Sequence, residues 1–236
     1  MTRRDLLRVL GAAGGGVLAG CLPTGSTDFS SPAQPSTRMP ATPTPVTSIA
    51  QPDCVITPQL TAGPFHFDVG LIRRDITEGK RGIPLRVAIR LVQATSCQPI
   101  GDAVVDVWHA DAVGRYSGYR GQGDDNVDTT GETFLRGIQV TDADGVAEFE
   151  TIYPGWYRGR TAHIHFKAYT GEQSFITSQL YFPDDTTDAV HLAEPYSMRE
   201  TRGMTNANDR LFRSDLLGHI THTTDGYVVS LTVGVG

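Results

Sequence analysis

The sequence lacks any cluster of Lys and Arg side chains that could neutralise a run of phosphates. Its 236 residues carry a formal net charge of −6 at pH 7, whereas surfaces that bind nucleic acid are basic. The sequence also has no internal repeat. These absences argue against nucleic acid as a partner, and the remaining composition is that of a globular protein long enough for one sizeable domain.

The N-terminus lacks an apolar run long enough to span a bilayer, and residues 1–21 read MTRRDLLRVLGAAGGGVLAGC. Arg3 and Arg4, followed by a short apolar run, resemble a twin-arginine export signal. The LAGC sequence resembles a bacterial lipobox, in which cleavage leaves Cys21 as a lipidated N-terminus. A core helix with a buried cysteine is the alternative. We predict an exported protein, anchored at the cell surface by this lipid alone or secreted.

The next segment, residues 22–50, is rich in Pro, Ser and Thr and has few large apolar side chains. Such a composition cannot offset the entropy lost on folding, and Pro-rich linkers are semi-extended. We therefore predict a linker over residues 22–50 and a folded catalytic domain over residues 51–236.

Cysteine is scarce, with three residues in the whole chain. Cys54 and Cys97 both lie in loop-like stretches, and thiols outside the cytosol are usually oxidised. We predict a disulfide between them, which would tie the start of the domain to a loop between two early strands. Two unrelated thiols are the alternative, because a sequence gives no distances.

Helical periodicity is scarce too, and the pattern from residue 51 onward is that of β-strands. Short runs rich in Val, Ile, Thr, Phe and Tyr alternate with turn residues. Strands are predicted over residues 84–93, 102–110, 134–141, 145–152, 161–169, 174–182 and 227–235. Asp144-Gly145 predicts a hairpin, and residues 185–196 predict one short helix, capped by Asp185 or Thr186 and stopped near Pro195. An all-β sandwich fits this pattern best.

One predicted strand carries two histidines on a single face. Side chains at i and i+2 of a strand point the same way, so His163 and His165 lie side by side while Ile164 points to the opposite face. Two imidazoles form half a metal site, and imidazole suits Zn, Cu, Fe and Ni alike. Two histidines with no metal are the alternative interpretation.

The residues around this pair restrict the choice of metal. Residues 154–169 contain no cysteine, Asp or Glu, but Tyr157 lies just after Pro154-Gly155, which we interpret as a turn. A free phenol has a pKa near 10, but a trivalent cation would hold it as a phenolate. A phenolate is a hard, charged oxygen donor, so the pattern favours Fe(III) over Zn(II) or Fe(II).

Two longer motifs carry a resemblance to a known family. TIYPGWYRGRTAHIHFK (residues 151–167) and DVWHADAVGRYSGY (residues 106–119) resemble the core signature of the intradiol ring-cleavage dioxygenases, which include the catechol 1,2-dioxygenases and protocatechuate 3,4-dioxygenases. The resemblance spans about residues 54 to 182. It implies a β-sandwich whose loops and strand ends hold a non-haem Fe(III).

The resemblance implies a set of four iron ligands: Tyr116, Tyr157, His163 and His165. By the family pattern, Tyr157 leaves the iron when a catechol binds and accepts one of its protons, while Tyr116 stays bound. Tyr119 is the alternative to Tyr116, but its spacing from Trp108 fits the family less well. Trp108 and His109 are interpreted as packing or supporting residues.

The resemblance also implies two further residues at the site. Arg160 matches an arginine that stabilises negative charge on the activated ring, and Gln179 matches a glutamine near that arginine. The implied reaction uses O2 to cleave a catechol-type diol between its two hydroxylated carbons, giving a muconate-type diacid.

The chain departs from the family pattern in residues 57–67, TPQLTAGPFHF. Ala62, Phe65 and His66 stand where the family usually has an acidic residue and tyrosines, so the substrate preference does not carry over. The helical dimerisation region of cytosolic catechol dioxygenases is also absent, so their oligomeric state does not carry over to this chain. Two other hypotheses stay open: a cell-surface binding module, and a Cu or Zn enzyme built on the same histidine pair.

Overall fold

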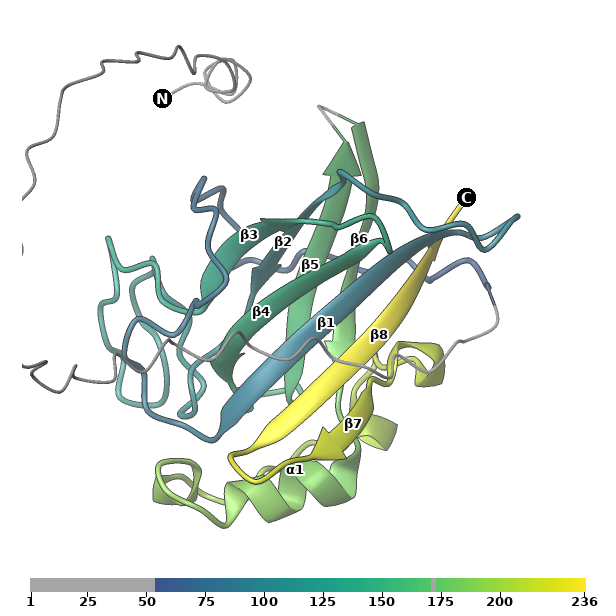
Figure 1. Cartoon of the computed structure of the whole chain (residues 1–236). Helices are drawn as coiled ribbons and strands as arrows, with labels where there is room; N and C mark the ends of the chain where they lie inside the picture. Colours follow the sequence, from purple (N-terminus) through teal and green to yellow (C-terminus); the bar gives the residue numbers. More distant parts are fainter. Residues whose placement is uncertain (1–53, 171–172) are drawn as a thin grey trace, which may run out of the picture. The chain divides into compact units, whose positions relative to one another are not determined.

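The computed structural model describes residues 54–170 and 173–236 (Figure 1). The predicted signal at 1–21, its lipidation site Cys21 and the predicted linker at 22–50 lie outside these ranges. Within the described ranges, no helix has both the length and the apolar character needed to cross a membrane.

Two four-stranded sheets form a sandwich, which confirms the predicted all-β fold (Figure 1). The first sheet has the order β4 (Val146–Ile152), β1 (Pro84–Gln93), β8 (Tyr227–Val235) and β7 (His219–His222). The second has the order β3 (Arg136–Val140), β2 (Val104–Trp108), β5 (His163–Thr170) and β6 (Gln173–Tyr181). All seven predicted strands are present. The additional strand β7 was not predicted, because three of its four side chains are exposed and give no apolar alternation.

The apolar core lies between the two sheets. The inner face of the second sheet is therefore apolar, whereas its outer face can carry polar side chains. Inward-facing side chains of β2 and β5 pack in one apolar cluster with those of the first sheet; they include Val105, Val107, Ile164, Phe166, Phe149 and Leu231. On β5 the intervening positions hold His163 and His165, which therefore lie on the outer face. The alternation that predicted the strand thus also places the histidine pair.

The turn predicted at Asp144-Gly145 is present, but the predicted hairpin is wrong. Asp142 accepts hydrogen bonds through its Oδ1 from the backbone N–H groups of Asp144 (2.9 Å) and Val146 (2.8 Å), and Gly145 has a φ of +77°. However, β3 and β4 belong to different sheets and do not pair. The turn therefore carries the chain from one sheet to the other, a distinction that turn residues alone do not encode.

One α-helix, α1 (Asp184–His191), follows β6 at the end of the sandwich where β8 begins (Figure 1). Its N-cap is Pro183, without a side-chain capping bond, so the predicted caps Asp185 and Thr186 lie inside the helix. Three short 3-10 turns follow before β7: η1 (Tyr196–Met198), η2 (Asn206–Asn208) and η3 (Ser214–Leu216). The segment from α1 to η3 supplies one wall of the site described below.

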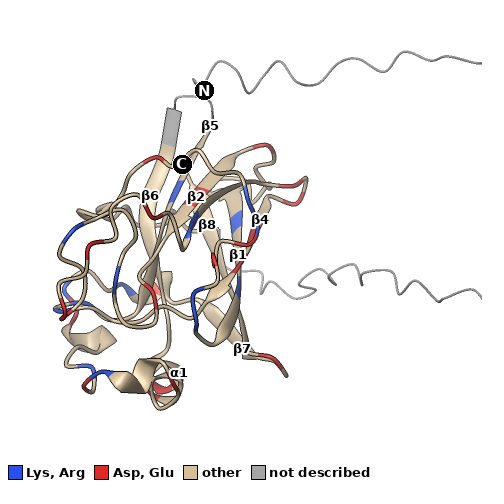
Figure 2. Ribbon diagram, turned by 90° about the vertical axis from the view of Figure 1, so that its left-hand side faces the viewer, with Lys and Arg blue, Asp and Glu red and all other residues tan. Residues whose placement is uncertain are grey.

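Charged residues of both signs are interspersed along the loops of the ribbon in Figure 2. Many are paired, as in Arg199 with Asp124 (2.6 Å) and Arg115 with Asp125. Exposed pairs of this kind contribute little to stability.

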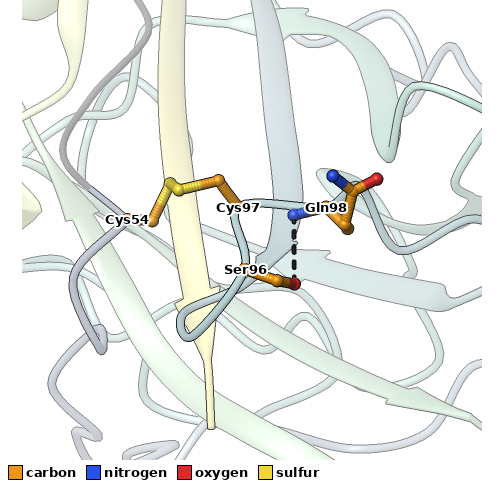
Figure 3. Close-up of a disulfide and its surroundings, with 4 residues drawn as sticks. All are labelled: Cys54, Ser96, Cys97 and Gln98. Carbon is orange, nitrogen blue, oxygen red and sulfur yellow. Dashed lines mark hydrogen bonds between the residues drawn. A yellow bond between two sulfur atoms is a disulfide. The ribbon is translucent and has the colours of Figure 1, made fainter.

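A disulfide joins Cys54 to Cys97, which lies in the loop between β1 and β2 (Figure 3). Just after Cys54, Thr57 is tied to β8, because its N–H donates to the carbonyl of Gly234 and its Oγ1 accepts from the N–H of Gly234, both at 2.9 Å. The start of the described chain is thus fixed at two points.

Replacing both Cys54 and Cys97 with Ser is expected to lower the free energy of unfolding by about 2–4 kcal/mol, because the unfolded chain would no longer contain the closed loop. Urea unfolding of the two proteins measures the difference. Adding a reductant should lower the midpoint of the wild-type protein and leave that of the double variant unchanged. Equal midpoints for oxidised wild type and double variant would contradict the expectation.

Candidate metal centre

The candidate site lies on the outer face of the second sheet. Cross-strand register places Arg136, Trp108, His165 and Gln179 in one row across all four strands. His163, two positions before His165, lies opposite Tyr181. Polar and aromatic side chains from four strands therefore meet on this face, with loops packed over them.

The two histidines point their Nε2 atoms at one another, 3.1 Å apart. Both are almost fully buried, with exposed fractions of 2% and 1%. His163 Nδ1 lies 2.7 Å from the carbonyl oxygen of Thr161, which requires the proton on Nδ1 and leaves a lone pair on Nε2. The ring of His165 is stacked on Trp108, with ring centroids 5.1 Å apart. Neighbouring groups thus fix the orientation of both imidazoles.

Burial, and to a smaller extent the nearby Arg160 guanidinium, lowers the pKa of His163 to about 3. The pKa of His165 is also well below its ordinary value, first because of burial and then because of His163 and Arg160. Both rings are therefore neutral at physiological pH, which is the state in which imidazole binds a metal.

Tyr157 reaches the histidines from a short turn. The N–H of Arg160 donates to the carbonyl of Tyr157 at 3.0 Å, and Arg158 and Gly159 form the turn between them. The turn is therefore at 157–160, and our prediction of a turn at Pro154-Gly155 was wrong. Gly155 instead lets two backbones meet, since a Cβ there would lie 2.5 Å from the carbonyl oxygen of Asp111.

The two tyrosines of the predicted set lie next to the histidines. Tyr157 Oη is 3.5 Å from His163 Nε2. Tyr116 is fully buried, and its ring centroid is 5.6 Å from that of Tyr157 and 6.3 Å from that of His165. The Tyr116 backbone is held by Gln122 Oε1, which accepts from its N–H (3.0 Å), and by Thr129 Oγ1, which donates to its carbonyl (2.7 Å).

The hydroxyl groups distinguish Tyr116 from Tyr119. Tyr119 Oη donates to the backbone carbonyl of His66 at 3.0 Å, so it is engaged away from the histidines. Tyr116 Oη is buried, makes no hydrogen bond of standard geometry among the described residues, and interacts with the Tyr157 hydroxyl. This geometry supports Tyr116 as the candidate ligand over Tyr119.

Neither Tyr116 nor Tyr157 would ionise by itself at neutral pH. Burial raises the pKa of Tyr116 well above 10. Burial also raises the pKa of Tyr157, although the Arg160 guanidinium opposes this effect. A phenolate at either position therefore requires a strong cation nearby.

The donor set fits a ferric ion. The Nε2 atoms of two neutral imidazoles lie 3.1 Å apart, and His165 Nδ1 and Tyr116 Oη are buried without a hydrogen bond of standard geometry among the described residues, so a cation could complete this cluster. In the part of the chain that the structure describes, no group of three or more His, Cys, Asp and Glu could hold a metal. Any metal held here would thus need the tyrosine oxygens, and phenolate favours Fe(III).

Arg160 lies beside Tyr157, with its Nη1 donating to Tyr157 Oη at 3.3 Å. Its Nη2 donates to Gln179 Oε1 and, at 3.0 Å, to Tyr181 Oη. Tyr181 Oη in turn donates to Gln179 Oε1 at 2.7 Å. The structure thus brings Arg160 and Gln179, both predicted from the resemblance, into one hydrogen-bonded cluster, and it adds Tyr181.

The N-terminal arm, residues 57–67, runs along β6 and then over the histidines. Gln179 Nε2 donates to the Thr61 carbonyl (3.2 Å), and Phe65 stacks on Tyr116 with ring centroids 4.6 Å apart. At Gly63, φ is +68° and a Cβ would lie 3.3 Å from His165 Cε1, so the backbone approaches the imidazole directly. The N-terminal arm, in which this chain departs from the family pattern, therefore covers the candidate metal centre.

His109 lies outside this cluster. It is buried, with Nδ1 2.9 Å from the Ala110 carbonyl oxygen and Nε2 2.7 Å from Thr151 Oγ1, so it braces two loop and strand segments. Trp108, also almost fully buried, packs between His66 and His165. Both residues are placed as the sequence predicted, as packing or supporting groups.

Burial lowers the pKa of His109 to about 4, which predicts a pH-dependent stability. Because the unfolded chain binds this proton near pH 6.5, the stabilisation is complete above that pH and is lost as the pH falls toward 4. Between pH 8 and pH 5, metal-free wild-type protein should lose about 2 kcal/mol more of its free energy of unfolding than His109→Gln. Urea unfolding at both pH values measures this, and an equal loss in the two proteins would contradict it.

Two residues of the site were missed in the sequence. Tyr181 is two positions beyond Gln179 on the same strand, so alternation could have predicted that the two side chains share a face. Asp209, whose carboxylate contacts Arg160 at 2.8 Å, lies in an irregular loop far along the chain. No local pattern marks it.

Comparisons with known proteins identify relatives of this chain. The profile of a family described as dioxygenase matches residues 57–226. The protocatechuate 3,4-dioxygenase beta chain of Burkholderia cepacia is 35% identical over 151 residues, 56% of this chain and 63% of that one. Catechol 1,2-dioxygenase 1 of Acinetobacter lwoffii is 28% identical over 152 residues, 55% of this chain and 47% of that one. The chain thus spans less than two-thirds of the length of these curated relatives.

Solved structures are similar over more of their length. An intradiol ring-cleavage dioxygenase from Tetranychus urticae superposes with a TM-score of 0.71 and 30% identity, covering 78% of this chain and 95% of that one. The dioxygenase domain of a dioxygenase and carbohydrate-binding protein fusion from Streptomyces sp. SirexAA-E has a TM-score of 0.58 and 29% identity, covering 77% of this chain and 99% of that one.

The fold and these matches place the chain among the proteins of a dioxygenase family. More particularly, it belongs to the intradiol ring-cleavage dioxygenase family, as a distant homologue of the protocatechuate and catechol dioxygenases. Members of this family typically use non-haem Fe(III).

Proposed function

We propose that this chain is an Fe(III)-dependent dioxygenase that cleaves catechol-type diols between their hydroxylated carbons. The observation that carries the proposal is the meeting of two neutral, buried imidazoles with the buried phenol of Tyr116 and the half-buried phenol of Tyr157. In this reading His163, His165, Tyr116 and Tyr157 hold the iron.

Bound Fe(III) would supply a Lewis acid that favours the anionic form of the diol and makes its ring reactive toward O2. The residues of the chain have separate tasks around it. Held as a phenolate, Tyr157 Oη would accept a proton from a diol hydroxyl, and the Arg160 cation beside it would stabilise negative charge that develops on the ring. Phe65, stacked on Tyr116, and the rest of the arm would limit the access of water to the metal. Both atoms of O2 enter the diacid product, so the reaction needs no external reductant.

The test is the visible absorption spectrum, with iron analysis, of the full chain purified without chelator and reconstituted with ferric iron. A broad phenolate-to-iron charge-transfer band that shifts when catechol is added is the expected result. Tyr116→Phe and Tyr157→Phe should each change the band. Tyr119→Phe is the matched control, because its hydroxyl faces His66 instead, and it should leave the band unchanged.

Other outcomes would favour the remaining hypotheses. A protein that stays colourless after ferric reconstitution would favour a binding module. Retention of Cu or Zn in a Tyr116→Phe/Tyr157→Phe variant would favour a different metalloenzyme built on the histidine pair.

We also propose that the enzyme acts outside the cytoplasm, exported through Arg3 and Arg4 and held by a lipid on Cys21 through the linker at 22–50. The disulfide between Cys54 and Cys97 is compatible with an oxidising compartment. Fractionation of cells that express the Arg3→Lys/Arg4→Lys variant tests the export route, and unchanged export would remove it.

A further inference from the structure

Asp209 lies in the loop that follows η2, and its carboxylate is buried against the candidate site. Its side chain is 1% exposed. Oδ2 accepts from Arg160 Nε at 2.8 Å and from the Thr161 N–H at 3.1 Å, and Oδ1 accepts from the Leu211 N–H at 2.9 Å. Burial would raise the pKa of Asp209, but the hydrogen bonds from Leu211 and Arg160 outweigh it, so the group is ionised at neutral pH.

The contacts of Arg160 show what this carboxylate does. One edge of the guanidinium is fixed by Asp209 through Nε, and Nη2 is fixed by Gln179 and Tyr181 on β6. These two anchors come from different parts of the chain and together determine the plane of the guanidinium group. Nη1 is left to point at Tyr157 Oη, 3.3 Å away.

Without the Asp209 carboxylate, the Arg160 guanidinium would no longer be held in this orientation. An arginine side chain has several rotatable bonds, and a guanidinium held at one edge can rotate about that contact. Gln179 and Tyr181 alone would hold Nη2 and allow Nη1 to move away from Tyr157. The Thr161 N–H would also lose its acceptor next to the first histidine of β5. Asp209 therefore controls where the positive charge lies relative to the phenol.

We propose that Asp209 is a positioning residue of the dioxygenase reaction, which acts through Arg160 by fixing its guanidinium beside Tyr157. This inference rests on the proposed function. Asp209 itself touches neither of the histidines nor either candidate tyrosine ligand in the hydrogen bonds of the described residues. Its substitution should therefore spare the metal and affect the chemistry.

The experiment compares iron-reconstituted full-chain wild type with Asp209→Asn in steady-state turnover of catechol. We expect kcat to fall roughly 10- to 100-fold, because displacement of a charged group by about 1 Å has effects of this size. KM should change less than about threefold, because the lost interaction acts in the transition state, and the iron content should be unchanged, because no proposed ligand is altered.

A double-mutant cycle tests whether the effect passes through Arg160. In an Arg160→Gln background, adding Asp209→Asn should change kcat by less than about threefold, since the guanidinium is already absent. The matched control is Asp188→Asn. Asp188 pairs at 2.7 Å with the buried Arg202 and makes no hydrogen bond to Arg160 or Asp209 among the described residues. That variant should keep wild-type kcat.

Asp209→Ser guards against a variant that fails to fold. Serine can still accept from the Leu211 N–H and so keep the local turn, but it cannot reach Arg160 with a charge. It should reproduce the loss in kcat. Wild-type kcat in both Asp209 variants, or equal losses with and without Arg160, would overturn the role of Asp209. Absence of colour and turnover in the wild-type protein would instead overturn the proposed function itself, and this role with it.

Discussion

His165→Ala is expected to abolish ferric binding and turnover. His165 Nε2 faces His163 Nε2 at 3.1 Å, and the ring is held on Trp108, so no other described side chain can replace it. Substitutions of residues that merely support a metal ligand already weaken binding about 10- to 100-fold, so loss of a ligand should exceed that range. Iron content, the visible band and kcat on catechol measure the effect.

The control for this prediction is His219→Ala. His219 is an exposed histidine at the start of β7 and has no part in the candidate site. It should keep iron and activity. If His165→Ala kept a full equivalent of iron and full turnover, the metal centre would have to lie elsewhere.

Arg160→Gln is expected to lower kcat by about 10²–10³-fold, the range found when one preorganised electrostatic group is removed. Arg160 is the only cation within hydrogen-bonding distance of Tyr157 Oη among the described residues, and Asp209, Gln179 and Tyr181 hold it there. Because it is not a ligand, iron content should stay near that of the wild type. Steady-state kinetics alongside iron analysis separates the two effects.

Arg158→Gln provides the matched control, because Arg158 lies in the same turn but its side chain is exposed. It removes the same charge at almost the same place in the chain. A loss of kcat in Arg158→Gln as large as in Arg160→Gln would mean that general electrostatics, and not the fixed guanidinium, supports the reaction.

The sequence predicted the sheets better than the connections between them. Alternation in β2, β5 and β8 follows from burial of one or both faces, so it is visible in the residues themselves. The Asp142–Gly145 turn looks the same whether the strands beside it pair or separate into two sheets. The difference depends on packing across the sandwich, which no local pattern contains.

Some residues of the candidate site could likewise be predicted from a local pattern, whereas others depend on contacts between distant segments. The alternation of β5 predicts that His163 and His165 are neighbours, whereas Tyr116 was identified only through the family resemblance. Its position depends on a loop held by Gln122, Thr129 and, through Ser117, the buried Arg136. Asp209 depends on a contact between segments far apart in the chain, so it could not be found before the structure.

If the chain is tethered as proposed, the two attachments at the start of the described chain have a mechanical consequence. The arm that roofs the histidines is continuous with the chain that leads back to the predicted linker. A pull on that linker would reach the disulfide of Cys54 first and the pairing of Thr57 with Gly234 next. Both attachments would transmit the force to the sandwich before it reaches residues 61–65. Tension on the linker would therefore leave the arm segment that covers the candidate metal centre undisturbed.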